Sequence, residues 1–233
     1  MFILGISSAA KIVSIGLVNE EKVLAETTIR AIQSEKIIHY INEAGIRPDQ
    51  INGIAVAAGP GSYSGLRGGL ATAKTLAQTL NLPLIGISTL EAIAYNLVDI
   101  EGTMAVVLDA RADEYNFALF GASQGRLKRL TDDLVLKLGL IKERLLEISG
   151  KLWVVGEGNR DWEVGKRENI HIADNIHSLP YGVNVAKLGL LKMQTGQTDD
   201  IFNLNPQYSH KPNIREFVDP LSRTAAMEFT NML

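Results

Sequence analysis

The sequence predicts an α/β protein built from two similar halves. Two observations indicate this class. Apolar stretches of strand length alternate with amphipathic helices, and the order of elements in the first hundred residues returns from about residue 102. In each half we expect three consecutive strands, a helix, a fourth strand and a second helix. Two such halves favour a duplicated ribonuclease-H-like architecture with a cleft between them. We expect an N-terminal lobe at 1–100 and a C-terminal lobe at 101–233 that ends in an irregular tail.

The first half contains five short apolar segments bounded by turn residues. The strands expected from them are 2–6, 12–18, 22–28, 51–58 and 84–87. A helix is expected over 33–44, because apolar residues recur on one of its faces, and Gly45 ends it. A second helix is expected over 66–80. Ser88 and Glu91 have the spacing of a capping box, in which each side chain bonds the other's backbone amide, and they predict a further helix start.

The second half repeats this order of elements with little residue-level identity. The strands expected there are 103–109, 114–121, 126–130 and 152–155, and the helices are 138–149 and 183–195. Gly196 ends the last helix. The chain beyond residue 199 is rich in Asn, Pro and Ser, and we expect it to pack irregularly over the surface.

A glycine-rich connection, Gly59-Pro60-Gly61-Ser62-Tyr63-Ser64-Gly65-Leu66-Arg67, joins the strand 51–58 to the helix 66–80. Such a turn directs unpaired N–H groups toward one point at a helix N-terminus, where the helix dipole favours an anion. We therefore take Gly59, Gly61, Ser62 and Arg67 as candidate nucleotide- or anion-binding residues. The segment matches neither the Walker motif nor GxGxxG. The alternative is a tight strand-to-helix connection without a ligand.

Composition excludes several kinds of site. The chain of 233 residues has a net charge of −3 and no cysteine, so a disulfide, a thiolate nucleophile and a Cys-based zinc site are all excluded. Its four histidines are scattered without metal-ligand spacing, and we expect no metal site. The charge argues against a free-standing nucleic-acid binder. The N-terminus lacks the pattern of a signal peptide, so we expect a cytoplasmic protein that makes no membrane contact.

The helix 66–80 has two stripes of different character. Leu66, Leu70, Ala73 and Ala77 form a core-type stripe. Next to it runs a stripe of mostly small residues, and small residues allow a close approach by another helix. We assign this stripe, together with the apolar residues of the helix 33–44, to a partner interface: Ile37, Ile38, Ile41, Gly65, Gly69, Thr72 and Leu76. On this assignment Gly69→Glu leaves the fold intact. The alternative is a contact between the two helices of this chain.

The segment 59–94 resembles the signature of the TsaB (YeaZ) family, and 33–46 and Asp109-Ala110-Arg111 are also similar to it. The resemblance covers about residues 1–195. It implies a two-lobed fold of the actin, sugar-kinase and Hsp70 type. It also implies a non-catalytic subunit that pairs with TsaD, its catalytic paralogue, in making threonylcarbamoyladenosine at position 37 of tRNA. A TsaE-type ATPase is a further expected partner, a homodimer is expected when TsaD is absent, and tRNA contact is expected to be indirect.

Two positions depart from the family pattern. The family has an aspartate after its first strand that helps ATP-using relatives to hold the metal–nucleotide, and here this position is Ser7. The family's first-helix histidine is Gln33. We therefore expect no catalytic residue and no cofactor on this chain itself, with ATP or ADP only at the partner interface.

Two enzymatic alternatives stay open at this point. One is an ATP-dependent small-molecule kinase of the same fold, and the other is a peptidase-like protein, suggested by the serines near Gly61. Asp109 and Arg111 are either a catalytic pair or, more simply, the anchor of a turn.

Overall fold

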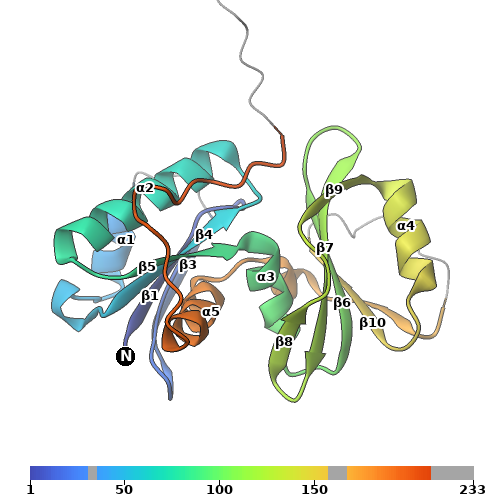
Figure 1. Ribbon diagram of the computed structural model, residues 1–233, viewed down its shortest axis with the longest axis horizontal. Coiled ribbons are helices and arrows are strands. Elements are labelled where there is room, and N and C mark those ends of the chain that lie inside the picture. Colours follow the sequence, from blue (N-terminus) through green and yellow to red (C-terminus); the bar gives the residue numbers. More distant parts are fainter. Residues whose placement is uncertain (31–35, 157–166, 211–233) are drawn as a thin grey trace, which may run out of the picture.

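The computed structural model describes residues 1–30, 36–156 and 167–210. Two mixed β-sheets with flanking helices form two lobes that lie side by side, as Figure 1 shows. This arrangement confirms the predicted two-lobed α/β class. No helix within the described residues is long and apolar enough to span a lipid bilayer.

The first sheet has the strand order β3-β2-β1-β4-β5. Its strands are β1 (Ile3–Ser7), β2 (Val13–Val18), β3 (Val23–Ile29), β4 (Gly53–Gly59) and β5 (Leu84–Ser88). β1, β2 and β3 form an antiparallel meander, and β4 and β5 continue the sheet in parallel from β1. Helices α1 (Ile37–Glu43) and α2 (Tyr63–Leu80) cover one face, and α5 (Gly182–Gln194) covers the other.

The second sheet has the order β11-β10-β6-β7-β8, with β9 also paired to β7. Its strands are β6 (Gly102–Asp109), β7 (Glu114–Ser123), β8 (Arg126–Arg129), β9 (Leu134–Lys137), β10 (Leu152–Val155) and β11 (Ile170–Ile172). When β6 is matched with β1, both sheets have the same order and the same parallel and antiparallel pairings. The repeat inferred from the order of elements is therefore confirmed at the level of topology.

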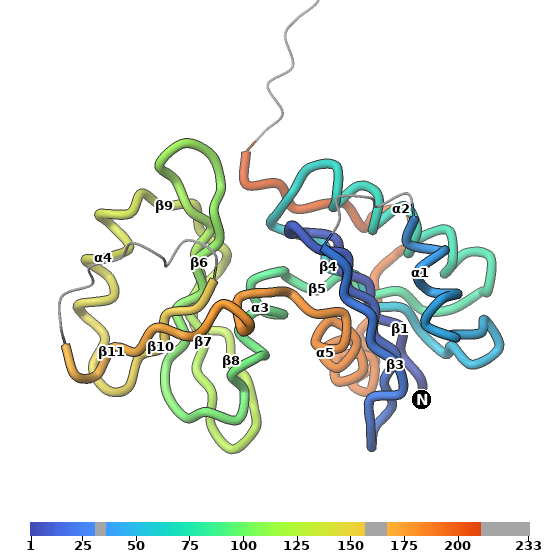
Figure 2. The backbone as a smooth tube through the Cα atoms, turned by 180° about the vertical axis from the view of Figure 1, so that it is seen from behind, coloured from blue at the N-terminus to red at the C-terminus, as the bar shows by residue number. Residues whose placement is uncertain are grey.

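Helix α5 packs on the first sheet, although we placed residues 101–233 in the C-terminal lobe. Glycines on both sides of this contact allow the helix backbone to lie directly on the strands. A Cβ on Gly5 would overlap the carbonyl oxygen of Gly182, and a Cβ on Gly182 would lie 2.6 Å from the amide nitrogen of Gly16. Figure 2 shows the chain leaving the second lobe and crossing back to this position. The expected division is corrected accordingly: α5 completes the first lobe.

Helix α3 (Thr89–Ala94) is buried between the lobes. Leu90 and Ile93 pack into the core of the second lobe, whereas Ala92 packs into the core of the first. Ser88 caps the helix as predicted, since its Oγ accepts the amide of Glu91 at 3.4 Å. The Glu91 carboxylate, which we expected to bond back to the cap, instead accepts a hydrogen bond from Lys192 of α5 at 2.8 Å. A polar contact between two helices thus replaces half of the capping box.

Most boundaries agree with those expected to within two residues, and the larger differences are in α2 and in two unexpected strands. α2 begins at Tyr63, because Ser62 caps it three residues earlier than the apolar stripe indicated. The short strands β9 and β11 were not expected. α4 (Leu138–Glu147) ends two residues early. The start of the expected helix 33–44, Gln33 included, lies outside the described residues.

The contact between α5 and the first sheet gives a stability prediction. Gly5→Ala places a methyl group against the Gly182 backbone, so we expect unfolding free energy to fall by about 3 kcal/mol or more. Thermal and urea unfolding measure the change. The matched control is Gly139→Ala in α4, where the added methyl meets open space and stability should stay unchanged or rise by up to about 1 kcal/mol. Equal effects of the two substitutions would contradict the close packing.

Candidate functional site: the glycine loop and the cleft between the lobes

The glycine loop runs from the end of β4 to the start of α2. Gly59 has a φ of +126°, which favours glycine, and a Cβ there would overlap the Gln207 carbonyl oxygen. A Cβ on Gly61 would overlap the carbonyl oxygen of Ala9. Glycine is therefore required at both positions because the backbone of another segment lies directly against the loop.

These neighbours change the expected chemistry of the loop. The Ser62 amide, which we expected to be free for an anion, donates to the Ala9 carbonyl oxygen at 2.7 Å. The Ser62 hydroxyl accepts the amide of Gly65 at 3.4 Å. Carbonyl oxygens lie against Gly59 and Gly61, and a carbonyl oxygen repels an anion. Other segments of the protein thus occupy part of the space around the loop. The loop has fewer free amides for binding an anion than the sequence indicated.

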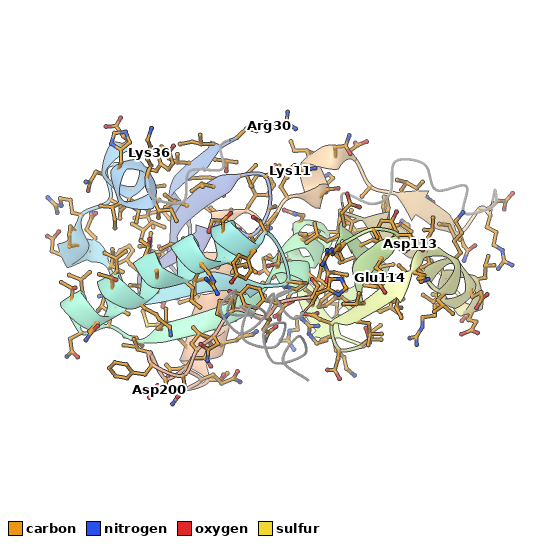
Figure 3. All side chains as sticks on the ribbon, turned by 90° about the horizontal axis from the view of Figure 1, so that it is seen from above. Lys11, Arg30, Lys36, Asp113, Glu114 and Asp200 are labelled. Atoms are coloured by element: carbon orange, nitrogen blue, oxygen red, sulfur yellow. The ribbon has the colours of Figure 1, made fainter. Side chains whose placement is uncertain are left out.

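A cleft of about 400 Å³ lies between the lobes beside this loop. The first lobe contributes the connection between β1 and β2 and the glycine loop, and the second contributes the turn between β6 and β7. A third wall comes from the C-terminal segment. The lining residues are Ala9, Ala10, Lys11, Gly61, Ser62, Tyr63, Leu108, Asp109, Ala110, Asn116, Tyr208, Ser209 and His210. Figure 3 shows Lys11 and Glu114 near this junction, one from each lobe.

Asp109 and Arg111 do not form a pair in the structure. Asp109 is exposed at the end of β6 and lines the cleft, and its carbonyl oxygen accepts from the Asn116 side-chain amide at 3.5 Å. The amide of Ala110 donates to the Glu114 carbonyl oxygen at 3.1 Å, which closes the turn. Arg111 is exposed and does not line the cleft. The turn geometry supports the structural explanation for this motif.

Arg67 lies outside the cleft lining, on the exposed side of α2. Its Nε donates to the Tyr208 hydroxyl at 2.9 Å, and its guanidinium lies 4.1 Å from the centre of the Tyr63 ring. The two tyrosine rings stack, with centroids 4.9 Å apart. The hydrogen bond that Arg67 donates to Tyr208 raises the pKa of Arg67. Of the four candidate residues, Gly61 and Ser62 line the cleft, whereas Gly59 packs against Gln207 and Arg67 is bound by Tyr208 of the C-terminal segment.

The small-residue stripe of α2 packs inside the lobe, which corrects its assignment to a partner interface. Gly65 and Gly69 are buried, and a Cβ on either would overlap an oxygen atom of Ser8. The Ser8 hydroxyl donates to the Gly65 carbonyl oxygen at 2.7 Å. Gly69→Glu is therefore expected to unfold the protein instead of leaving the fold intact.

Two residues of α1 that we also assigned to the interface belong to the core. Ile37 and Ile41 are buried in the cluster below α1, because this face of the helix rests on the sheet. Leu76 packs partly against the same cluster, and the Thr72 hydroxyl donates to the Gly68 carbonyl oxygen at 2.9 Å. Ile38 is the member of the set that is largely exposed, at 46%.

Ser7 occupies the end of β1, where its side chain is fully buried and its hydroxyl has no hydrogen-bond partner among the described residues. Its cross-strand neighbour Ser14 accepts the amide of Gly182 at 2.8 Å, so this side of the sheet is closed by the start of α5.

Within residues 1–30, 36–156 and 167–210, no three His, Asp or Glu side chains are placed to hold a metal ion.

The sequence analysis missed the contribution of the C-terminal segment to the site. Tyr208, Ser209 and His210 line the cleft, although residues beyond 199 were expected to pack irregularly. Tyr208 reaches Arg67 across 141 positions of sequence. A local pattern carries no signal for such a contact, since neither partner is marked by periodicity or by a motif.

Comparisons with known proteins show which family this chain resembles. Residues 19–146 match the family model described as "TsaD: tRNA N6-adenosine threonylcarbamoyltransferase". The chain is similar to the tRNA threonylcarbamoyladenosine biosynthesis protein TsaB of Bacillus subtilis, with 32% identity over 153 residues, which are 63% of this chain and 67% of that protein. It is also similar to TsaB of Escherichia coli, with 28% identity over 217 residues, which are 89% of this chain and 94% of that protein.

A solved structure extends the likeness to the three-dimensional arrangement. YeaZ from Pseudomonas aeruginosa superimposes with a TM-score of 0.76 and 20% identity, covering 89% of this chain and 99% of that one. The structural match supports the fold alone. Together with the family model and the curated relatives, which span both lobes, it leads to one conclusion: the chain belongs to the TsaB (YeaZ) family.

Proposed function

We propose that this chain is a subunit of tRNA threonylcarbamoyladenosine biosynthesis that pairs with a TsaD-type threonylcarbamoyltransferase. The observation that carries this proposal is the similarity to two proteins named for that pathway, one of which matches over 89% of this chain. The family model, named for the transferase, matches residues 19–146 of this chain. A subunit that shares the fold of the transferase, as a paralogue would, fits both findings.

We further propose that the chain has no catalytic activity of its own. Phosphoryl transfer in this fold needs carboxylates that hold a divalent metal. Ser7 stands at the end of β1 and is buried under α5, and among the described residues that line the cleft Asp109 is the one carboxylate. The amide of Ser62 is already bonded to Ala9, so the phosphate cradle of a kinase is incomplete.

A peptidase is supported even less by the geometry. Ser62 uses its hydroxyl to accept the amide of Gly65, which is the role of a helix cap. His210 lines the cleft, but it faces Glu114, with 3.5 Å between His210 Nε2 and Glu114 Oε2. No hydrogen bond joins a histidine to a serine hydroxyl within the described part of the chain, so a nucleophile and its base are not in place.

The partner surface that we now propose is the outer face of α2 together with the exposed part of α1. On α2 this face consists of residues that are small or polar, with an arginine at its start: Ser64, Arg67, Ala71, Thr75 and Gln78. On α1 it includes Ile38, whose exposed side chain is apolar. Such a face lets another helix approach closely, with one apolar anchor beside it.

A second copy of this chain is expected there when the TsaD-type partner is absent. A TsaE-type ATPase would join the complex afterwards.

A single charge on this face tests the docking proposal. Ala71→Glu should leave the melting temperature within a few degrees, because Ala71 is exposed. It should abolish co-elution with the TsaD-type protein of the same organism on a sizing column, since an uncompensated carboxylate in a helix contact costs several kcal/mol. Leu140→Glu, on exposed α4 of the second lobe, is the matched control and should co-elute normally. Normal binding by Ala71→Glu would show that the interface does not include this face of α2.

Nucleotide binding is expected only in the complex, at the glycine loop beside the partner. The isolated chain should therefore show no magnesium-dependent ATP hydrolysis, and its melting temperature should shift by less than about one degree in millimolar MgATP. A ligand present at about 100 times its Kd would add about 2.7 kcal/mol, a shift of several degrees. Hydrolysis that purifies with the protein, or a shift of that size, would favour the kinase alternative.

A further inference from the structure

The C-terminal segment 199–210 runs from the edge of the first sheet to the second lobe, and we call it the strap. It begins beside β5, where the Asp199 amide donates to the Leu84 carbonyl oxygen at 2.8 Å. The Asp199 carboxylate in turn accepts the amide of Gly86 at 2.7 Å. These bonds cover the open edge of β5. Figures 1 and 2 show the strap continuing along α2 toward the junction of the lobes.

The middle of the strap is anchored to the first lobe by backbone and core contacts. The Gln207 amide donates to the Ala58 carbonyl oxygen at 2.7 Å, and the Lys74 ammonium donates to the Phe202 carbonyl oxygen at 3.3 Å. The side chains of Ile201 and Leu204 pack against the core of the first lobe. Backbone hydrogen bonds and two apolar side chains therefore hold this part of the strap to the first lobe.

The last three described residues of the strap bridge to the second lobe through side chains. Tyr208 stacks on Tyr63 and accepts from Arg67, as described above. The Ser209 hydroxyl lies 2.6 Å from the Asn116 side-chain oxygen on β7, and His210 faces Glu114 of the same strand. Arg67 and Tyr63 are exposed, the three latch residues and Glu114 are half-buried, and Asn116 is buried. These are single side-chain contacts without backbone pairing, and partly exposed polar contacts each contribute little to stability. This end can therefore release while the anchored part stays in place.

We propose that residues 208–210 are an autoinhibitory latch on the partner-binding face. In the latched state of this structure, Tyr208 holds Arg67 at the start of that face and the latch forms one wall of the cleft. In the released state, Arg67 and Tyr63 are free to meet the partner and the cleft is open on that side. Partner docking then competes with the latch, and the apparent affinity falls by the fraction of chains that are released. The identity of the partner rests on the proposed function, and the latch itself rests on the contacts described above.

A reversible cross-link tests the latch directly, because the chain has no cysteine of its own. The double variant Glu114→Cys with His210→Cys places its two cysteines on either side of the contact and allows a short, cleavable bismaleimide to join them. We expect the cross-linked protein to bind the TsaD-type partner about tenfold more weakly than the same protein after cleavage. Equal or tighter binding in the cross-linked state would overturn the latch.

Point variants give the opposite change. Tyr208→Ala should bind the partner several-fold more tightly than the wild type, and Tyr208→Phe, which keeps the ring but loses the hydroxyl, should lie between them. Phe202→Ala is the control, since this side chain is 77% exposed in the anchored part of the strap, and it should bind as the wild type does. Unchanged affinity in Tyr208→Ala with a wild-type melting temperature would contradict the proposal.

Hydrogen exchange in the isolated chain separates failure of the latch from failure of the proposed function. Amides of residues 59–67 should exchange faster in Tyr208→Ala than in the wild type, and more slowly in the cross-linked protein than after cleavage. If no form binds the partner but exchange changes in this way, the partner assignment is wrong and the latch stands. If exchange is the same in all forms, the latch is overturned.

Discussion

The arrangement of the two lobes depends on the burial of α3 between them. Its side chains are divided between the two cores, with Ala92 in the first and Leu90 and Ile93 in the second. Asn184 of α5 donates to the Ala92 carbonyl oxygen at 3.1 Å and so ties this helix to the one beside it. A large opening of the lobes would expose apolar side chains of α3 to water, which is unfavourable by roughly 25 cal/mol for each Å². The burial of α3 therefore opposes a large opening of the lobes.

A buried helix at the junction of the lobes is consistent with the proposed role as a binding subunit. Enzymes that close around a substrate gain from a hinge between domains, which sequesters the reaction from water. Here the junction is filled by a buried helix, carbonyl oxygens of the protein itself lie against Gly59 and Gly61 of the glycine loop, and Ser7 is buried under α5. The rigid framework instead presents the outer faces of α1 and α2 in a constant geometry. The end of the strap, residues 208–210, contacts both lobes through side chains and belongs to neither core.

Local sequence patterns predicted most of the elements and the repeat, but they did not predict which sheet each helix joins. The apolar residues of α3 or α5 look the same whichever sheet covers them. The sequence analysis therefore did not predict that α3, which follows the first sheet, packs largely into the second lobe, or that α5, which follows the second sheet, packs on the first. The stripe containing Gly65 and Gly69 was assigned to a partner for a related reason. Small residues mark a close approach, and here that approach is to Ser8 of the same chain. The strap was missed because its contacts join residues more than ninety positions apart.

Hydrogen exchange of the unmodified chain, alone and with the TsaD-type protein of the same organism, tests the central claim most directly. The account predicts slower exchange in the complex over residues 36–43 and 63–79, with little change in α4 and β10 of the second lobe. Slower exchange confined to the second lobe, or no complex at all, would contradict the claim that this protein is a binding subunit that docks through α1 and α2.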